Sequence, residues 1–497
     1  MQEWIRKQKL FSIINTYKEI LLTILFVFIV VYVAINQSVW LDEGLSIAFA
    51  RRSLQEIISL TVKIDLHPPL YYIWLHLIQS IFPTSIFMSR VWSILAYLAC
   101  GLLISNYIKE KRGANSYDAF LALLFFLISP FAMFYASEAR SYEIVILVSF
   151  IQFIFFEKFL HSGSRKYLLS YVLVSVASVY LFYLFILNLV AQFIYICVER
   201  RDVFKKIFGA WFLIFLSYVP WIYFVLWHRL DTKPSHFLEI PWWQIPAIIF
   251  TGFSGGRTAI TDLNHTHWYW PTVLISIAYT LQFMGLWYLY KDQKYRMYMK
   301  LMVYLAGIPL AVCLLISATR FSIFDPRYYS EIFFIFVIFL VLSSLALRDI
   351  NRRLWMVITA FFLITNTLFI SLYLFNPWFK REPWKLVVSE IEAKAESSDA
   401  VIFIGCSSPP APYMEYRKKS IKLINTNGEC ESFLNSPDQI FQHLTKETEG
   451  IQRIWYSQYL EWQRDPNRIM RQAIEKQFKY IDTVGFFKVK FDIYERK

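Results

Sequence analysis

The sequence is poor in cysteine and contains no internal repeat and no low-complexity stretch. Five cysteines occur in 497 residues. Three of them, Cys100, Cys197 and Cys313, fall in apolar runs, where cysteine usually serves as a small packing residue. A disulfide between Cys406 and Cys430, in the polar C-terminal stretch, is permitted but not implied. The missing repeat argues against a chain built from duplicated halves.

Charged residues make up only 18% of the chain, whereas 57% of the residues are hydrophobic and 19% are aromatic. The apolar residues come in runs of roughly 16 to 23, about the length needed to cross the hydrocarbon core of a bilayer. The composition therefore predicts a multi-pass membrane protein. The net charge of +13 does not indicate a nucleic-acid partner, because Lys and Arg cluster in short segments between the apolar runs.

Eleven apolar runs fit membrane spans, and the basic segments between them predict the orientation. With the N-terminus in the cytoplasm, the segments rich in Lys and Arg all fall on the cytoplasmic side, as is usual for membrane proteins. The first run is long and no small-residue cleavage site follows it, so we interpret it as an anchor rather than a signal sequence. The expected spans are 20–36, 87–108, 116–134, 142–157, 167–181, 184–198, 208–228, 268–290, 300–317, 327–347 and 353–375.

Residues 68–83 look like a further span, but counting them as one would move the basic segment 109–112 to the outer side and reverse every later loop. We therefore expect these residues to form a helix that lies in the outer membrane interface. Pro68 and Pro69 at the start and Pro83 at the end suit such a segment.

The polar residues 377–497 are assigned to a small α/β domain outside the cytoplasm, which follows a membrane domain formed by residues 1–376. Hydrophobic periodicity predicts both helices and strands in this tail. We expect Asp465 to cap the last helix and Pro466 to be its first residue. The expected helices are near 384–397, 436–448 and 465–477, and the expected strands are 399–405, 451–457, 478–484 and 487–494.

Two adjacent carboxylates, Asp42 and Glu43, follow the first span on the predicted outer face. A carboxylate there can accept a proton from an incoming hydroxyl group, or coordinate a divalent ion that bridges to a phosphate. Alternatively the pair caps a helix, since acids favour the N-terminal end of a helix. Because other polar motifs return to the same face, we favour the catalytic interpretation.

Two of these motifs carry arginine. The turn after the third span contains Glu138 and Arg140, and the tenth span opens with Arg327 and Tyr328. Arginine suits two-point binding of a phosphate, and a second acid there can complete a metal or acceptor site. In the alternative interpretation, Glu138 and Arg140 pair with each other or with lipid headgroups, and Arg327 is an interfacial anchor.

The order of these motifs along the chain resembles a known family. Asp-Glu follows span one, His-Pro-Pro-Leu-Tyr-Tyr (67–72) precedes span two, Ser-Glu-Ala-Arg-Ser-Tyr (137–142) follows span three, and Arg-Tyr opens a late span. This order is similar to that of the bacterial membrane glycosyltransferases related to dolichyl-phosphate-mannose protein mannosyltransferases and to the aminoarabinose transferase acting on lipid A. The resemblance covers the membrane half, especially residues 35–145. The tail, which begins Pro383-Trp384-Lys385, matches only in position and pattern.

The resemblance implies a GT-C type fold of about 11 transmembrane helices, with two interfacial helices in the first outer loop. It makes Asp42 the general base, with Glu43 beside it. Many relatives carry a histidine between spans five and six, where this chain has Tyr-Leu-Phe-Tyr (180–183). No cofactor is implied with certainty, but a divalent metal, Mg²⁺ or Mn²⁺, would be held by Asp42 and Glu138. The residues expected to bind the lipid phosphate are Lys63, His67, Arg140, Arg327 and Tyr328.

Residues and resemblance together predict an inverting glycosyltransferase in the bacterial inner (cytoplasmic) membrane. It would move a hexosyl or pentosyl group from a polyprenyl-phosphate donor to a lipid, glycan or protein acceptor on the outer side. The alternative is a lipid-linked sugar transporter or flippase, but such a protein more often has charged residues at mid-membrane depth and repeated halves. A sensor with its ligand in residues 376–497 would leave the outer-loop acids without a role.

Overall fold

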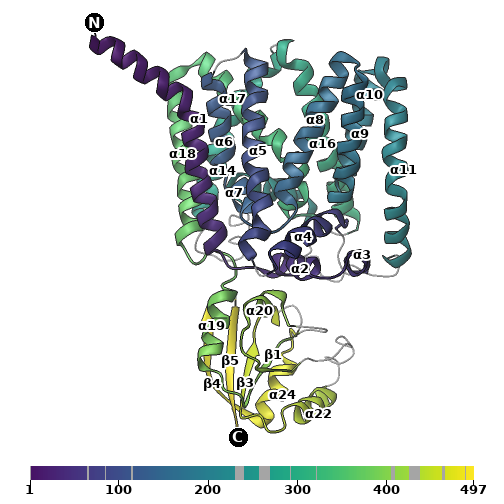
Figure 1. The fold of residues 1–497 in the computed structure, drawn as a ribbon, viewed down its shortest axis with the longest axis vertical. Helices are drawn as coiled ribbons and strands as arrows, with labels where there is room; N and C mark the ends of the chain where they lie inside the picture. Colours follow the sequence, from purple (N-terminus) through teal and green to yellow (C-terminus); the bar gives the residue numbers. More distant parts are fainter. Residues whose placement is uncertain are drawn as a thin grey trace. The chain divides into compact units, whose positions relative to one another are not determined.

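A computed structural model of the chain shows two compact units (Figure 1). Unit 1 comprises Met1–Ile35 and Phe49–Asn376, and unit 2 comprises Asn36–Ala48 and Pro377–Lys497. Residues 36–48, which the sequence analysis assigned to the membrane domain, thus group with the tail. The structure describes residues 2–63, 67–83, 85–113, 116–229, 240–256, 269–291, 293–320, 322–404, 409–424, 437–461, 465–486 and 489–497.

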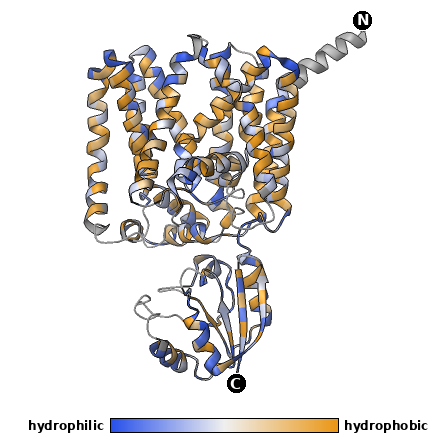
Figure 2. Cartoon of the chain, turned by 180° about the vertical axis from the view of Figure 1, so that it is seen from behind, coloured by the Kyte–Doolittle hydropathy of each residue, from blue (hydrophilic) through white to orange (hydrophobic). Residues whose placement is uncertain are grey.

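Unit 1 is helical throughout its described part. Its long helices run side by side, with mostly hydrophobic residues along their lengths and hydrophilic residues toward their ends (Figure 2). Such a pattern matches a bundle that has lipid around it and water at both faces. The helices are α1 (Gln2–Asn36), α3 (Leu54–Lys63), α4 (Leu70–Ile81), α5 (Ile86–Arg112), α6 (Ser116–Leu127), α7 (Pro130–Ala136), α8 (Tyr142–Ser162), α9 (Arg165–Leu181), α10 (Phe185–Glu199), α11 (Phe204–Arg229), α12 (Ile245–Gly255), α14 (Tyr269–Phe283), α15 (Leu286–Lys291), α16 (Gln293–Thr319), α17 (Ser330–Ile350) and α18 (Arg352–Phe375).

Within the described residues, eight helices are long and apolar enough to cross a membrane, or nine if the bent pair α6–α7 is one span. The protein is therefore an integral membrane protein, as the composition predicted. All eleven expected runs fall on helices, but α9 and α10 contain only 17 and 15 residues. The number of eleven spans consequently stays a prediction.

The segment 68–83 forms a helix of its own, α4, which has 12 residues and is too short to span a bilayer. In Figure 1, α3 and α4 lie across one end of the long helices. His76 of α4 places its Nδ1 atom 2.8 Å from the carbonyl oxygen of Ala50, which fixes α4 against the chain that precedes α3. The separate helix is confirmed, and its position in the membrane interface stays a prediction.

Helix α17 forms the centre of unit 1. In its most apolar stretch 89% of the residues are buried, compared with 22% in α1. Phe333 and Phe336 on this helix pack against Phe253 of α12 at ring-centre distances of 5.1 and 5.3 Å. A helix that is hydrophobic on all sides is expected to be surrounded by other helices. Gly285 allows a close approach to α17, because a Cβ atom there would collide with the carbonyl group of Ser343.

The third expected span is broken. The axes of α6 and α7 differ by 62° at the break, where Ser129 accepts a hydrogen bond from the Ala132 N–H (3.4 Å) and Pro130 is the first residue of α7. Serine as N-cap followed by proline is a strong signal for a helix start. The break redirects the chain before the turn 137–141, which carries candidate site residues.

Unit 2 contains a five-stranded sheet in the order β2-β1-β3-β5-β4. Strand β1 is parallel to β2 and β3, whereas β5 is antiparallel to β3 and β4. The sheet has a separate group of buried residues on each face. Trp455 of β3 belongs to one group, with Trp384, whereas its neighbours Ile454 and Tyr456 belong to the other, because successive side chains of a strand point to opposite faces. The elements are β1 (Asp399–Ile402), β2 (Lys422–Ile424), β3 (Arg453–Ser457), β4 (Phe478–Phe486), β5 (Val489–Arg496), α19 (Trp384–Lys394), α20 (Ala411–Tyr416), α22 (Pro437–Glu447) and α24 (Ile469–Gln477).

The predicted α/β class of the tail is confirmed, with corrections in detail. The sequence analysis missed β2 and α20, which are short. The last helix begins at Ile469 rather than at Pro466. Asp465 nevertheless caps it, because its carboxylate accepts hydrogen bonds from the Ile469 and Met470 N–H groups (2.8 and 2.9 Å). Cys406 and Cys430 lie outside the described residues.

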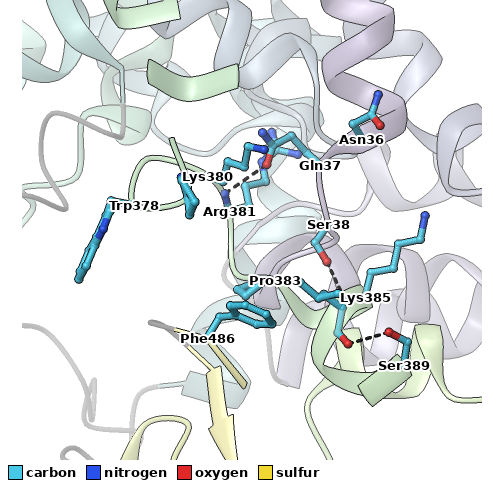
Figure 3. A pocket seen from close by; sticks show the side chains of 12 residues that line it. Asn36, Gln37, Ser38, Trp378, Lys380, Arg381, Pro383, Lys385, Ser389 and Phe486 are labelled. Carbon is cyan, nitrogen blue, oxygen red and sulfur yellow. Dashed lines mark hydrogen bonds between the residues drawn. The ribbon is translucent and has the colours of Figure 1, made fainter. Parts of the chain in front are cut away.

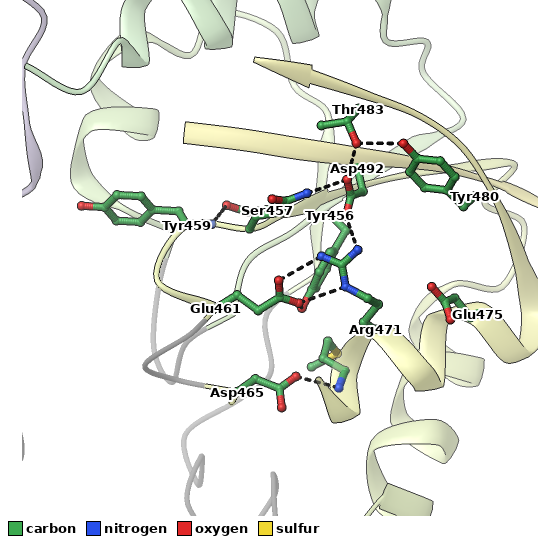
Figure 4. A network of polar contacts seen from close by, with 12 residues as sticks. Tyr456, Ser457, Tyr459, Glu461, Asp465, Arg471, Glu475, Tyr480, Thr483 and Asp492 are labelled. Atoms are coloured by element: carbon green, nitrogen blue, oxygen red, sulfur yellow. Dashed lines mark hydrogen bonds and ion pairs between the residues drawn. The ribbon is translucent and has the colours of Figure 1, made fainter. Parts of the chain in front are cut away.

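A polar network joins α24 to the sheet (Figure 4). Arg471 Nη2 lies 2.9 Å from Glu461 Oε2, and Nη1 lies 2.5 Å from Asp492 Oδ2. The Arg471 guanidinium also stacks on the ring of Tyr456, 5.4 Å from its centre. This arginine is therefore bound by two carboxylates inside unit 2.

Candidate active site

The residues predicted to act on substrate fall into two groups, one in each unit. The carboxylates Asp42 and Glu43 belong to unit 2. Lys63 is the last residue of α3, and its side chain lies outside the described part of the structure. The remaining candidates, all in unit 1, are His67, Glu138, Arg140, Arg327 and Tyr328.

The turn that carries Arg140 joins α7 to α8 and is fixed by α5. Ser93 of α5 donates hydrogen bonds to the carbonyl oxygens of Glu138 (2.7 Å) and Arg140 (3.3 Å). Ser137, at the start of the turn, donates to the carbonyl oxygen of Phe134 (2.9 Å). Glu138 is fully buried and Arg140 almost so. The backbone of the turn is thus held at both residues, which gives the Arg140 side chain a defined direction.

Arg140 contacts two tyrosine hydroxyls. Its Nη1 donates to Tyr72 Oη of α4 (3.4 Å), and its Nη2 donates to Tyr142 Oη at the start of α8 (3.2 Å). The guanidinium carbon also lies 5.5 Å from the centre of the Tyr142 ring, within range of a cation–π interaction. The two phenol hydroxyls accept these hydrogen bonds and so orient the guanidinium.

Arg327 approaches the same tyrosine from the short helix η4 (Pro326–Tyr329). Its guanidinium carbon lies 5.8 Å from the centre of the Tyr142 ring and 5.3 Å from that of Tyr328. Asp325 orients this turn, because its carboxylate accepts the Arg327 N–H (3.2 Å) and pairs with Arg327 Nε (3.1 Å). We call Tyr72, Arg140, Tyr142, Arg327 and Tyr328 the arginine–tyrosine cluster.

His67 lies at the edge of this cluster. Its Nε2 atom is 3.5 Å from Tyr142 Oη, and its ring centre is 6.1 Å from that of Tyr183. Phe182 packs on the other part of the ring, at 6.3 Å. Phe182 and Tyr183 belong to the turn 180–183, where many relatives in the family that this chain resembles carry a histidine. In this chain the turn supplies aromatic contacts to His67. The structure thus brings together four of the predicted residues: His67, Arg140, Arg327 and Tyr328.

Asp42 and Glu43 lie in the first turn of α2 (Leu41–Ala50). The Gly44 N–H donates to the Trp40 carbonyl oxygen (2.8 Å), so neither acid is the N-cap residue. The helix dipole still favours negative charge in this turn. Asp42 is half-buried, whereas Glu43 is fully buried. Of the two, only Asp42 is therefore accessible to an acceptor hydroxyl.

Glu43 pairs with an arginine that the sequence analysis missed. Its Oε2 atom lies 3.7 Å from Arg381 Nη1, and the side chain of Arg381 is only 2% exposed. Removal of one partner of a buried ion pair usually costs about 3–5 kcal/mol, because it leaves the other charge uncompensated. The pair holds Glu43 in place, and the catalytic role predicted for Glu43 stays a prediction.

Residues 37–44 are held by the C-terminal part of unit 2. Gly44 packs so closely on Pro412 that a Cβ atom would lie 2.9 Å from the proline ring. Nothing in the sequence signalled these contacts. Three backbone N–H groups donate to side chains and so join residues 37–39 to the C-terminal part of unit 2. Arg381 N–H donates to Gln37 Oε1 (3.2 Å), Lys385 N–H to Ser38 Oγ (2.9 Å) and Val39 N–H to Tyr416 Oη (2.8 Å).

The predicted metal ligands are Asp42 and Glu138, which belong to different units. Among the described residues, no three His, Cys, Asp or Glu side chains are grouped so that they could hold a metal ion. The metal site stays a prediction, and no chemical step is derived through a metal.

Comparisons with known proteins identify the fold. No model of a protein family and no curated protein sequence matches the chain. Among solved structures, ArnT from Cupriavidus metallidurans in the apo state is similar, with a TM-score of 0.59 and 11% identity over 96% of this chain and 97% of that one. ArnT from the same organism bound to undecaprenyl phosphate gives a TM-score of 0.58 and 14% identity over 96% and 98%. ArnT is an aminoarabinose transferase with the GT-C fold, so the fold implied by the sequence resemblance is confirmed.

Proposed function

We propose that this protein is an inverting glycosyltransferase that moves a sugar from a polyprenyl phosphate to an acceptor on the outer side of the cytoplasmic membrane. The observation that carries the proposal is the convergence of Arg140 and Arg327 on the Tyr142 ring, in a chain with the fold of ArnT, one structure of which is bound to undecaprenyl phosphate. Two guanidinium groups near one point suit a phosphate ester.

The arginine–tyrosine cluster would stabilise the leaving group. When the bond between the anomeric carbon and the phosphate oxygen breaks, the oxygen keeps the electron pair and negative charge grows on the lipid phosphate. Arg140 and Arg327 would bind this charge, and Tyr72 and Tyr142 keep Arg140 oriented. Donors fixed in advance near a developing charge typically contribute about 10²–10³ in rate each.

Asp42 would act as the general base. The acceptor hydroxyl oxygen forms the new bond to the anomeric carbon from the side opposite the phosphate, so the configuration inverts, and its proton passes to the Asp42 carboxylate. Such proton transfer is typically worth about 10²–10⁴ in rate. Glu43 and Arg381 hold the turn that carries Asp42. A divalent ion, if the enzyme uses one, would help to bind the phosphate.

The test uses the purified full chain in lipid nanodiscs with a glycosylated undecaprenyl phosphate and a lysate-derived acceptor fraction. We expect free undecaprenyl phosphate to appear in step with a glycosylated product of inverted anomeric configuration. If the sugar-lipid changes leaflet in vesicles and neither product forms, the protein is a transporter.

The proposed location requires a defined orientation. Reporter fusions after residues 112 and 204 should be cytoplasmic, because these positions lie at helix ends beside Lys- and Arg-rich segments, and a fusion after residue 400 should lie outside. Protease protection of the same fusions in spheroplasts provides the check. An external reporter at residue 112 would reverse the orientation and place the candidate site on the wrong side of the membrane.

A further inference from the structure

A pocket of about 580 Å³ lies in unit 2 near the points where the chain leaves two membrane helices. Its walls come from residues 36–38, which end or follow α1, from residues 377–389, which follow α18, and from Phe486 of β4. The first wall segment begins at the last residue of α1, and the second begins two residues after the end of α18. Consecutive Cα atoms are 3.8 Å apart, so the first residues of both segments lie close to a helix end. Two wall segments of the pocket are therefore continuous in the chain with membrane helices.

The lining combines lysines with large apolar side chains that are exposed. Trp378, Leu386 and Phe486 are 43%, 51% and 44% exposed. Lys380 is half-buried and Lys385 is exposed. Figure 3 shows Lys380 beside Arg381 and Gln37, with the Lys385 amino group extending toward the side of Asn36. Tryptophan and lysine side chains together are typical of the headgroup region of a membrane.

We propose that this pocket binds the headgroup of an anionic phospholipid of the surrounding bilayer. The two lysine amino groups would contact the phosphate, and Trp378, Leu386 and Phe486 would contact the glycerol and the first acyl carbons. Arg381, which pairs with Glu43, forms part of the same wall.

The apolar part of the lining favours a lipid over a soluble phosphate compound. A free phosphate gains nothing from three exposed apolar side chains, whereas an amphiphile buries them and gains the hydrophobic free energy. Charge complementarity selects an anionic headgroup over a zwitterionic one, since a lysine near an anionic membrane contributes roughly fivefold to binding. This binding does not depend on the proposed transferase activity.

The experiment measures lipid binding by native mass spectrometry of the full chain in detergent, with phosphatidylglycerol and phosphatidylcholine as probes. We expect phosphatidylglycerol to bind more tightly, and Lys380→Gln/Lys385→Gln to weaken it by about 25-fold. Lys446→Gln/Lys479→Gln removes the same charge from exposed positions elsewhere in the tail and should leave the affinity unchanged. Lys380→Arg, which keeps the charge, should also retain binding.

A second arm tests the apolar contacts. Trp378→Ser should weaken phosphatidylglycerol binding at low and high salt alike, whereas the effect of the lysine pair should shrink as salt screens the charges. Equal affinity for the two lipids, or equal affinity of the two double variants, would overturn the proposal. Glycerol phosphate that displaces phosphatidylglycerol at an equal concentration would also overturn it, in favour of a soluble phosphate ligand.

Discussion

Two arginines, Arg471 in unit 2 and Arg140 in unit 1, have different surroundings. In unit 2, Arg471 is bound by the carboxylates of Glu461 and Asp492, so its charge is compensated within the protein (Figure 4). In unit 1, Arg140 donates to the hydroxyls of Tyr72 and Tyr142 and lies on a tyrosine ring. The two carboxylates hold Arg471 inside the fold, whereas the two phenol hydroxyls orient the Arg140 guanidinium. The comparison predicts that the first arginine matters for stability and the second for an anionic substrate.

The largest expected effect concerns Asp42, the proposed general base. Asp42→Asn keeps the shape of the side chain but cannot accept a proton, so transfer should fall by about 10²–10⁴. Donor binding should remain near that of the unchanged protein, because the proposal assigns the phosphate to Arg140 and Arg327. The measurement is the rate of product formation by purified protein, with Asp438→Asn in α22 as the matched control. Full activity of Asp42→Asn would show that Asp42 is not the general base.

The next effect is on stability and tests the structural half of the comparison. Arg471→Met leaves Glu461 and Asp492 without their cation, so the free energy of unfolding of unit 2 should fall by about 3 kcal/mol. Hydrogen exchange of the amides of β3 and β5 reports this loss locally. Lys479→Met, at an exposed position of β4, should leave exchange unchanged. Unchanged exchange in Arg471→Met would show that the network contributes little.

The third effect tests the functional half. Arg140→Lys and Arg327→Lys keep the charge but lose the forked geometry, so the rate of transfer should fall by about tenfold, less than on full removal of a donor. Thermal stability should change little. The exposed Arg320→Lys, at the end of α16, is the control. If both variants lose stability and keep their rate per folded molecule, the cluster is structural and the comparison fails.

The smallest effect concerns an exposed acid in unit 1. The Ser53 hydroxyl and N–H donate to the Glu56 carboxylate (2.8 and 3.0 Å), and these hydrogen bonds lower the pKa of Glu56. Because the pKa of Glu56 is lower in the folded chain, the ionised carboxylate stabilises α3 at pH values above the ordinary pKa of glutamate. This stabilisation is lost as the pH falls through the lowered pKa. In Glu56→Gln, the protection of the α3 amides against hydrogen exchange should therefore no longer decrease as the pH falls below about 4. Ser53→Ala should reduce the protection of α3 at neutral pH.

The sequence could predict features that depend on neighbouring residues. Apolar runs placed the long helices, because crossing a bilayer requires about 20 apolar residues in succession. The prolines around residue 68 and the charge pattern marked α4 as separate from the spans. Alternating hydrophobicity placed β3, β4 and β5 of the tail. Short elements such as β2, with three residues, contain too few positions for a periodic signal.

Only the tertiary structure decided which distant residues meet. Arg140 and Arg327 were each marked by local motifs, but their convergence on Tyr142 follows from the packing of α8 beside α17. Arg381 carried no local signal, because its partner Glu43 lies at the other end of the chain. Hydropathy and helix periodicity report a residue's immediate neighbours and its exposure. The pairing of charges across the fold is a property of the assembled chain, because it depends on contacts between segments that no local pattern links.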